Sequence, residues 1–142
     1  MNSQQLAQAC ANALYERDVA AQALGIVVQS VAPGGASLTM SVRSDMLNGH
    51  AIGHGGFIFT LADTAFAYAC NSQNESAVAS GARIEYLAPA RLDDQLTATA
   101  KVVSQRGKTG IYDVEVQNQS GELIAVFRGN SHRIKGSVIE NG

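Results

Sequence analysis

The sequence predicts an α+β fold in which an antiparallel β-sheet wraps around one long buried helix. Two observations predict it. Residues 55–69 are apolar on almost every face of a helix, which is typical of a helix inside a protein. Strand-like segments joined by short turns precede and follow this helix, which is typical of antiparallel sheets. A chain of 142 residues suits a single such domain over residues 1–142.

Before the central helix, the sequence predicts one helix and two strands. The helix is expected from Ser3, which can cap it, to about Ala20. Its apolar stripe consists of Leu6, Cys10, Ala13 and Leu14. Strands are expected over 26–31 and 36–42, with Pro33-Gly34-Gly35 as the turn between them. Alternation in the second strand directs three residues to the core, namely Leu38, Met40 and Val42.

After the central helix, alternation and turn residues predict four more strands. They are expected over residues 78–87, 96–102, 112–117 and 123–127. In the second of these, four residues are expected to face the core, namely Leu96, Ala98, Ala100 and Val102. The last segment is apolar throughout, which suits a central strand.

The central helix carries one charge. Asp63 is the only Asp, Glu, Lys or Arg between Met46 and Asn74. A lone carboxylate in apolar surroundings costs several kcal/mol unless it is paired, hydrogen-bonded or protonated. Asp63 is therefore either a functional group or a structural carboxylate that bonds backbone amides or an arginine.

A glycine-rich run from Asn48 to Gly56 leads into the helix. Because the first amides of a helix have no partner within it, Gly55 and Gly56 offer donors to an oxygen that becomes negative. No Gly-Lys-Ser/Thr follows, which argues against a nucleoside triphosphate site. The stretch thus supplies an oxyanion site and, in Asp63, a base.

No metal site is predicted. His50 and His54 are four residues apart, but no third ligand follows at a recognisable spacing, so ring packing or orientation is the preferred interpretation. Cys10 and Cys70 are expected to be reduced thiols that pack as small apolar residues.

The composition indicates which classes of partner to expect. A net charge of −2 indicates no binding of nucleic acid. No apolar run suggests a signal peptide or a membrane span, so a cytoplasmic protein without a membrane partner is expected.

The order of strand, strand, buried helix and strand meander, with His54-Gly55-Gly56 before Leu61-Ala62-Asp63, resembles the hotdog-fold acyl-CoA thioesterases. The resemblance covers nearly the whole chain. The chain is especially similar to the thioesterases of bacterial phenylacetate degradation, through residues 46–50, 54–56, 61–72 and 127–129.

The resemblance implies the roles of site residues. Gly55 would polarise the thioester carbonyl, Asp63 would attack it or activate water, and Asn48 would orient the reacting groups. An assisting hydroxyl would come from Thr64 or Ser80. The expected substrate contacts are His54, Gly56, Thr64 and Phe66.

The expected reaction is hydrolysis of (hydroxy)phenylacetyl-CoA, or a related aryl-acyl-CoA, to the free acid and coenzyme A. Coenzyme A is part of the substrate, so no separate cofactor is expected. Some of the eight Lys and Arg from Arg83 onward are candidates for its phosphates, with a solvated sheet surface as the default interpretation. The alternatives are a hotdog-type enoyl-CoA hydratase or dehydratase using His54 and Asp63, and a non-catalytic acyl-CoA-binding protein.

Helix geometry predicts a shared site. Gly55 and Asp63 are eight residues apart, which separates them by roughly 12 Å along the helix axis. Because one thioester carbon cannot meet both, each site should take Gly55 and Asn48 from one subunit and Asp63 from another. The smallest active species would be a homodimer, and the resemblance implies pairs of dimers, a homotetramer.

Overall fold

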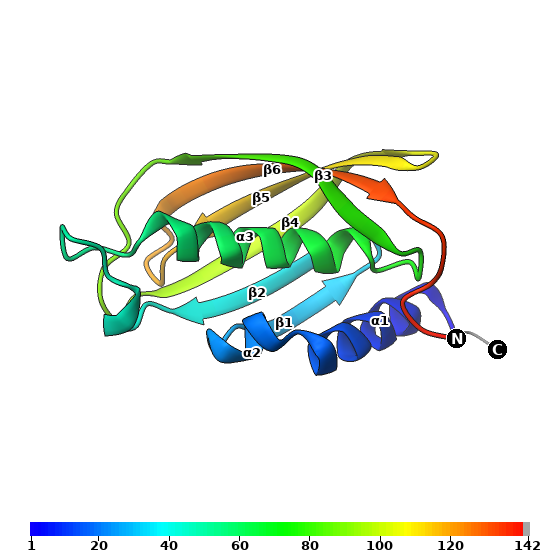
Figure 1. The fold of residues 1–142 in the computed structure, drawn as a ribbon, viewed down its shortest axis with the longest axis horizontal. Helices are drawn as coiled ribbons and strands as arrows, with labels where there is room; N and C mark the ends of the chain where they lie inside the picture. Colours follow the sequence, from blue (N-terminus) through cyan, green and yellow to red (C-terminus); the bar gives the residue numbers. More distant parts are fainter. Residues whose placement is uncertain (141–142) are drawn as a thin grey trace.

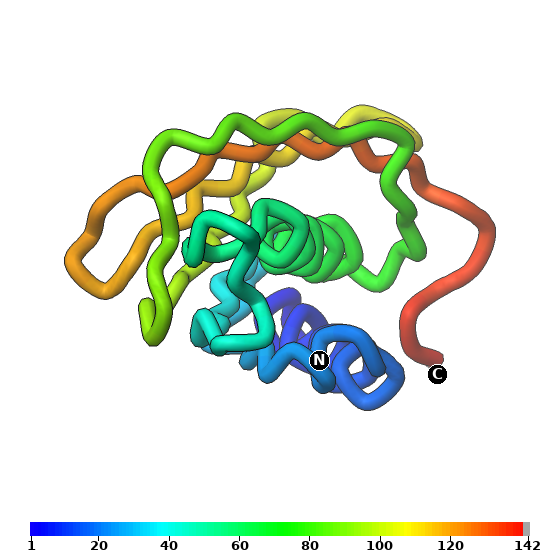
Figure 2. Tube along the Cα trace, turned by 60° about the vertical axis from the view of Figure 1, so that its left-hand side comes forward, coloured from blue at the N-terminus to red at the C-terminus, as the bar shows by residue number. Residues whose placement is uncertain are grey.

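The computed structural model describes residues 1–140, and its centre is helix α3 (Gly55–Cys70). The helix lies against one six-stranded antiparallel sheet with the strand order β1-β2-β4-β5-β6-β3. The strands are β1 (Val27–Ala32), β2 (Gly35–Ser41), β3 (Ala77–Tyr86), β4 (Gln95–Arg106), β5 (Thr109–Gln117) and β6 (Leu123–Arg133). Figure 1 shows α3 in front of the sheet, and Figure 2 shows the sheet curling around it. The hotdog fold implied by the resemblance is confirmed.

The N-terminal helix differs from the prediction at both ends. Asn2, not Ser3, is its cap: the amide of Gln5 donates to the Asn2 side chain, and the Gln5 side chain accepts the Asn2 amide. Helix α1 (Ser3–Arg17) then stops, because the Asp18 side chain accepts the amide of Ala21 and caps a separate short helix, α2 (Val19–Ala23). Both helices lie beside β1 (Figure 1).

The alternation predicted for the strands holds for β2 and β5, whose inward residues are buried. Val102 in β4 is the exception. This residue is 43% exposed although it still pairs with Tyr112, and the register against β5 shifts just after it, between Val102 and Ser104. Strand β6 also continues six residues past the predicted end at Phe127, since β3 pairs with it as far as Arg133.

The helix packs tightly against the sheet at Gly129 of β6. A Cβ at this position would lie 2.8 Å from the ring of Phe66, so only glycine leaves room for that ring. Phe66 is 1% exposed, and its ring centroid lies 5.7 Å from that of Tyr112 and 5.8 Å from that of Phe127. These aromatic contacts fix the position of α3 over the centre of the sheet.

The two thiols match the sequence prediction. Cys10 in α1 and Cys70 in α3 are both buried and free. Among residues 1–140, no helix is long and apolar enough to cross a lipid bilayer.

Candidate active site

Helix α3 is buried on most sides, but one row of residues along it is only partly covered. The row consists of Gly56, Thr60, Asp63, Thr64 and Ala67. The sequence predicted burial all round, whereas in the structure of one chain this row faces away from the sheet. Asp63 lies in the middle of the row and is half-buried.

Among residues 1–140, the Asp63 carboxylate has no partner that offsets the cost of its burial. Desolvation by burial raises the pKa of its side chain, and no hydrogen bond or cation within residues 1–140 lowers it again. Within residues 1–140, Asp63 therefore has neither the arginine nor the backbone amides that a structural carboxylate would bond. A partly buried carboxylate with a raised pKa is a candidate general base.

Asp63→Asn is expected to raise the melting temperature at pH 7 by about 2 to 5 °C. Because the folded state raises the pKa of Asp63, it binds more protons than the unfolded chain between the two pKa values, so stability falls as pH rises through that window. The amide removes this loss at neutral pH, and the difference should vanish well below the ordinary aspartate pKa. Melting curves at pH 7 and at acidic pH measure it.

Asp113→Asn is the matched control. The Arg128 guanidinium donates to both oxygens of Asp113, at 2.6 and 2.9 Å, and lowers the pKa of that carboxyl. Its ionised form is therefore favoured by folding, and the amide should lower the melting temperature slightly. A marked loss of stability in Asp63→Asn, in the same direction as the control, would mean that Asp63 is a structural residue.

The N-terminus of α3 is arranged by His54, its cap residue. The amide of Gly56 donates to Nδ1 of His54 at 2.9 Å, and the His54 ring stacks edge-on to Phe57 at 6.0 Å. The sequence predicted free amides at both glycines, but that of Gly56 is already used. Gly55 stands at the first helical position, where no carbonyl of the helix can accept its amide. Gly55 is thus the candidate oxyanion donor.

Asn48 organises the loop before the helix. Its side-chain oxygen accepts the amides of His50, at 2.9 Å, and Ile52, at 3.4 Å. The amide of Asn48 also donates to the carbonyl of Ile52, which closes the loop. The Asn48 oxygen is therefore committed to the fold of the loop, and its side-chain amide is the part suited to a reacting group.

Asn48 and Gly55 open into the same groove, which has a volume of about 580 Å³. Its walls come from the loop, the start of α3 and the segment that follows β3, and its apolar members include Ile52, Ile58, Tyr86 and Leu87. Asp63 does not line it. The structure of one chain thus brings two of the three predicted catalytic residues together and leaves the third, Asp63, on the partly covered row of α3.

Tyr86 also lines this groove, and the sequence analysis did not identify it as a site residue. Its hydroxyl donates to the carbonyl of Gly55 at 2.8 Å. The signal in the sequence was an aromatic residue just before the Ala88-Pro89-Ala90 break, at the end of a strand, but no local pattern relates that position to a glycine 31 residues earlier.

A model of the thioesterase superfamily matches residues 50–125, which is more than half of the chain and includes Gly55 and Asp63. This chain belongs to the thioesterase superfamily. Among the relatives of this thioesterase is acyl-coenzyme A thioesterase PaaI of Escherichia coli strain K12, with 54% identity over 90% of this chain and 91% of that protein.

Solved structures of thioesterases support the same family assignment. The structure of the E. coli PaaI protein from the phenylacetic acid degradation operon matches with a TM-score of 0.94 and 51% identity, over 96% of this chain and 99% of that one. A hypothetical thioesterase of Streptococcus pneumoniae TIGR4, solved with coenzyme A, matches with a TM-score of 0.75 and 28% identity, over 79% and 90% of the two chains.

The other residues expected at the site of this thioesterase lie apart from the groove. The Thr64 hydroxyl donates back to the carbonyl of Thr60 at 2.6 Å, and the exposed Ser80 in β3 donates to the carbonyl of Asn130 at 3.2 Å. Phe66 is a core residue, and its almost complete burial leaves no surface for a substrate in this chain. A contact between Phe66 and substrate stays a prediction.

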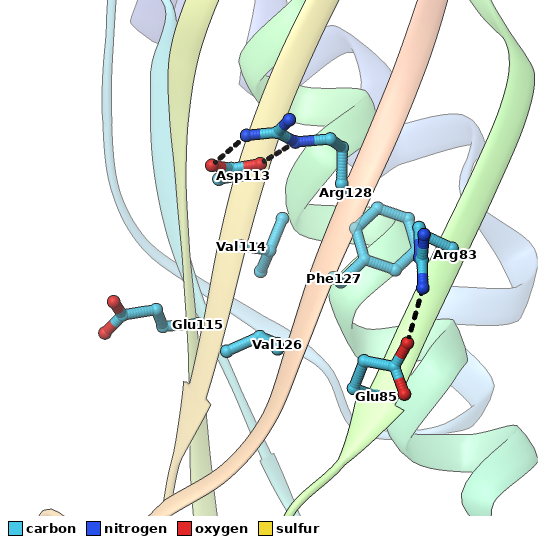
Figure 3. A pocket seen from close by; sticks show the side chains of 8 residues that line it. All are labelled: Arg83, Glu85, Asp113, Val114, Glu115, Val126, Phe127 and Arg128. Carbon is cyan, nitrogen blue, oxygen red and sulfur yellow. Dashed lines mark hydrogen bonds and ion pairs between the residues drawn. The ribbon is translucent and has the colours of Figure 1, made fainter.

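A second hollow of about 390 Å³ lies on the outer face of β3, β5 and β6, away from α3, and contains none of the predicted site residues (Figure 3). Two ion pairs occupy it, Arg128 with Asp113 and Arg83 with Glu85. Each arginine faces a carboxylate, which offsets part of the positive charge that coenzyme A phosphates would need. For these two arginines, the structure agrees with the default interpretation, that they lie on a solvated sheet surface.

No group of three or more His, Cys, Asp or Glu side chains within residues 1–140 is placed to share a metal ion.

Proposed function

We propose that this thioesterase, as one hotdog domain over residues 1–142, hydrolyses phenylacetyl-CoA or closely related aryl-acyl-CoA thioesters to the free acid and coenzyme A. The observation that carries the proposal is the half-buried, unneutralised carboxylate of Asp63 on a helix that begins with the amide of Gly55. The likeness to PaaI supports the choice of the aryl acyl group, and the groove beside Gly55 has the apolar walls that such a group needs.

In the proposed reaction, the thioester oxygen accepts the Gly55 amide while Asp63 takes a proton from water, whose oxygen attacks the carbonyl carbon. One good amide donor to the resulting oxyanion stabilises the transition state by roughly 3 kcal/mol. The tetrahedral intermediate then expels the coenzyme A thiolate. Direct attack by Asp63 to form a mixed anhydride, followed by its hydrolysis, is the other route that these residues allow.

The site is proposed to be shared between two subunits. Asp63 lies about 12 Å along the helix axis from Gly55 and outside the groove that holds Gly55 and Asn48. The row of α3 that holds Asp63 is only partly covered, and within residues 1–140 β3, at the end of the sheet, pairs with β6 alone. A second copy that packs against this side would carry its own groove to Asp63. Assembly of such dimers in pairs and a cytoplasmic location stay predictions.

The test is a screen for release of coenzyme A thiol from aryl-acyl and straight-chain acyl-CoAs. We expect kcat/KM for phenylacetyl-CoA or its ring-hydroxylated relatives to exceed that for straight-chain substrates by at least about tenfold. A change in enoyl absorbance without thiol release would favour a hydratase, and tight binding without turnover would favour a non-catalytic acyl-CoA-binding protein. Equal rates on all acyl groups would refute the aryl preference alone.

A further inference from the structure

We propose that Tyr86 is a positioning residue for the oxyanion donor: it fixes the first turn of α3 so that the Gly55 amide points into the groove. The inference rests on the proposed role of that amide. It adds a residue that contacts neither the thioester nor the attacking water.

The first turn of α3 needs such support because it starts with two glycines. Glycine is the most flexible residue and lowers helix stability by about 1 kcal/mol relative to alanine at interior positions. Adjacent glycines at a helix start would let the turn fray, and the direction of the Gly55 amide would vary. An oxyanion donor stabilises charge well only when its direction is fixed before the reaction.

Two side chains hold the peptide unit between these glycines, one at each end. Its carbonyl, from Gly55, accepts the Tyr86 hydroxyl at 2.8 Å, and its N–H, from Gly56, donates to Nδ1 of His54 at 2.9 Å. With both ends of this unit fixed, rotation at the Gly55 α-carbon is restricted, and so is the neighbouring peptide unit that carries the Gly55 N–H.

Close packing explains why these positions are glycine in spite of their flexibility. A Cβ at Gly55 would lie 2.9 Å from the Cζ and hydroxyl atoms of Tyr86, and one at Gly56 would lie 3.1 Å from Nδ1 of His54. The two clamping side chains therefore occupy the space that side chains at residues 55 and 56 would need. The packing that requires glycine at these two positions is therefore also the packing that restrains the flexible turn.

Tyr86 is well placed for this task because the sheet holds it. It is the last residue of β3, where its backbone is paired with Ala125 of β6. A tyrosine hydroxyl is protonated at neutral pH and able to donate, and burial raises the pKa of the Tyr86 hydroxyl further. Tyr86 is 50% exposed and lines the groove, so the hydroxyl contact bridges the sheet edge and the helix start at the site itself.

Tyr86→Phe is the test, because it keeps the ring and removes only the hydroxyl. We expect kcat for thiol release to fall about tenfold with KM within twofold of the wild type, since misdirection of one donor costs transition-state stabilisation and not substrate binding. The matched control is Tyr15→Phe, which also removes a hydroxyl that donates to a backbone carbonyl, that of Ile26 at 2.6 Å, at a residue that does not line the groove. The control should lower stability as much or more and leave kcat unchanged.

Hydrogen exchange gives a readout independent of turnover. The Phe59 amide bonds the Gly55 carbonyl in the helix, so it should exchange about fivefold to tenfold faster in Tyr86→Phe, and at the wild-type rate in Tyr15→Phe. Unchanged kcat and exchange in Tyr86→Phe would overturn the proposal, and so would a raised KM at constant kcat, which would mean that the hydroxyl contacts substrate. If the wild type cleaves no acyl-CoA, the proposed function fails, while the exchange rates still decide whether Tyr86 holds the turn.

Discussion

Asp63→Asn is expected to lower kcat for acyl-CoA hydrolysis by about 100-fold or more, with KM and the fold preserved. The amide has nearly the same shape as the carboxylate but can neither take a proton from water nor attack the carbonyl. Because the substrate would bind through the groove and the Gly55 amide, its affinity should change little. Steady-state thiol release and calorimetric binding of a non-hydrolysable thioether analogue measure the two effects separately.

The pH profile supplies a second readout of the same change. Since burial raises the pKa of Asp63, and the ionised form is the active one, kcat/KM of the wild type should fall on the acid side with a midpoint above the ordinary aspartate range. The residual activity of Asp63→Asn should lack this acid limb, whereas the surface control Asp113→Asn should keep both the limb and the wild-type rate. Near-wild-type turnover in Asp63→Asn would remove Asp63 from the mechanism.

Local patterns were sufficient to predict the centre of the molecule. The apolar character of residues 55–69 depends on side chains within one helix, and the observed α3 differs from it by a single residue at its end. Asp63 stood out because a charge in an apolar segment is a contrast within the segment itself. Gly55 followed from the same logic, because the amides at a helix start are free whatever surrounds the helix.

The parts that the sequence did not predict depend on distant partners. Strand β6 continues through a polar segment to Arg133 because β3 pairs with it, and that pairing joins segments about 50 residues apart. The bulge that follows Val102 in β4 is defined only by the pairing of this strand with β5. The bond from Tyr86 to Gly55 likewise joins two elements whose proximity is set by the order of the strands, which alternation alone does not determine.

A shared site predicts that two inactive variants restore each other. Asp63→Asn damages one half of the site and Asn48→Asp the other. The Asn48 change keeps the oxygen that accepts the amides of His50 and Ile52, so the loop should remain folded while the side-chain amide is lost. In a dimer with one chain of each kind, one site carries both defects and the other carries none. Such mixed dimers, isolated through two different affinity tags, should show about half of the wild-type activity.

The control places both substitutions in one chain and pairs it with a wild-type chain. If each site combines two subunits, every site in this dimer carries one defect, and activity should stay near that of the single variants. If Asp63 instead acts on a carbonyl held by its own chain, the two results are reversed. The dimer with a wild-type chain then keeps one intact site and about half of the activity, whereas the first mixed dimer has no intact site. Since the two dimers contain the same residues in total, only the distribution of the site between subunits can explain a difference between them.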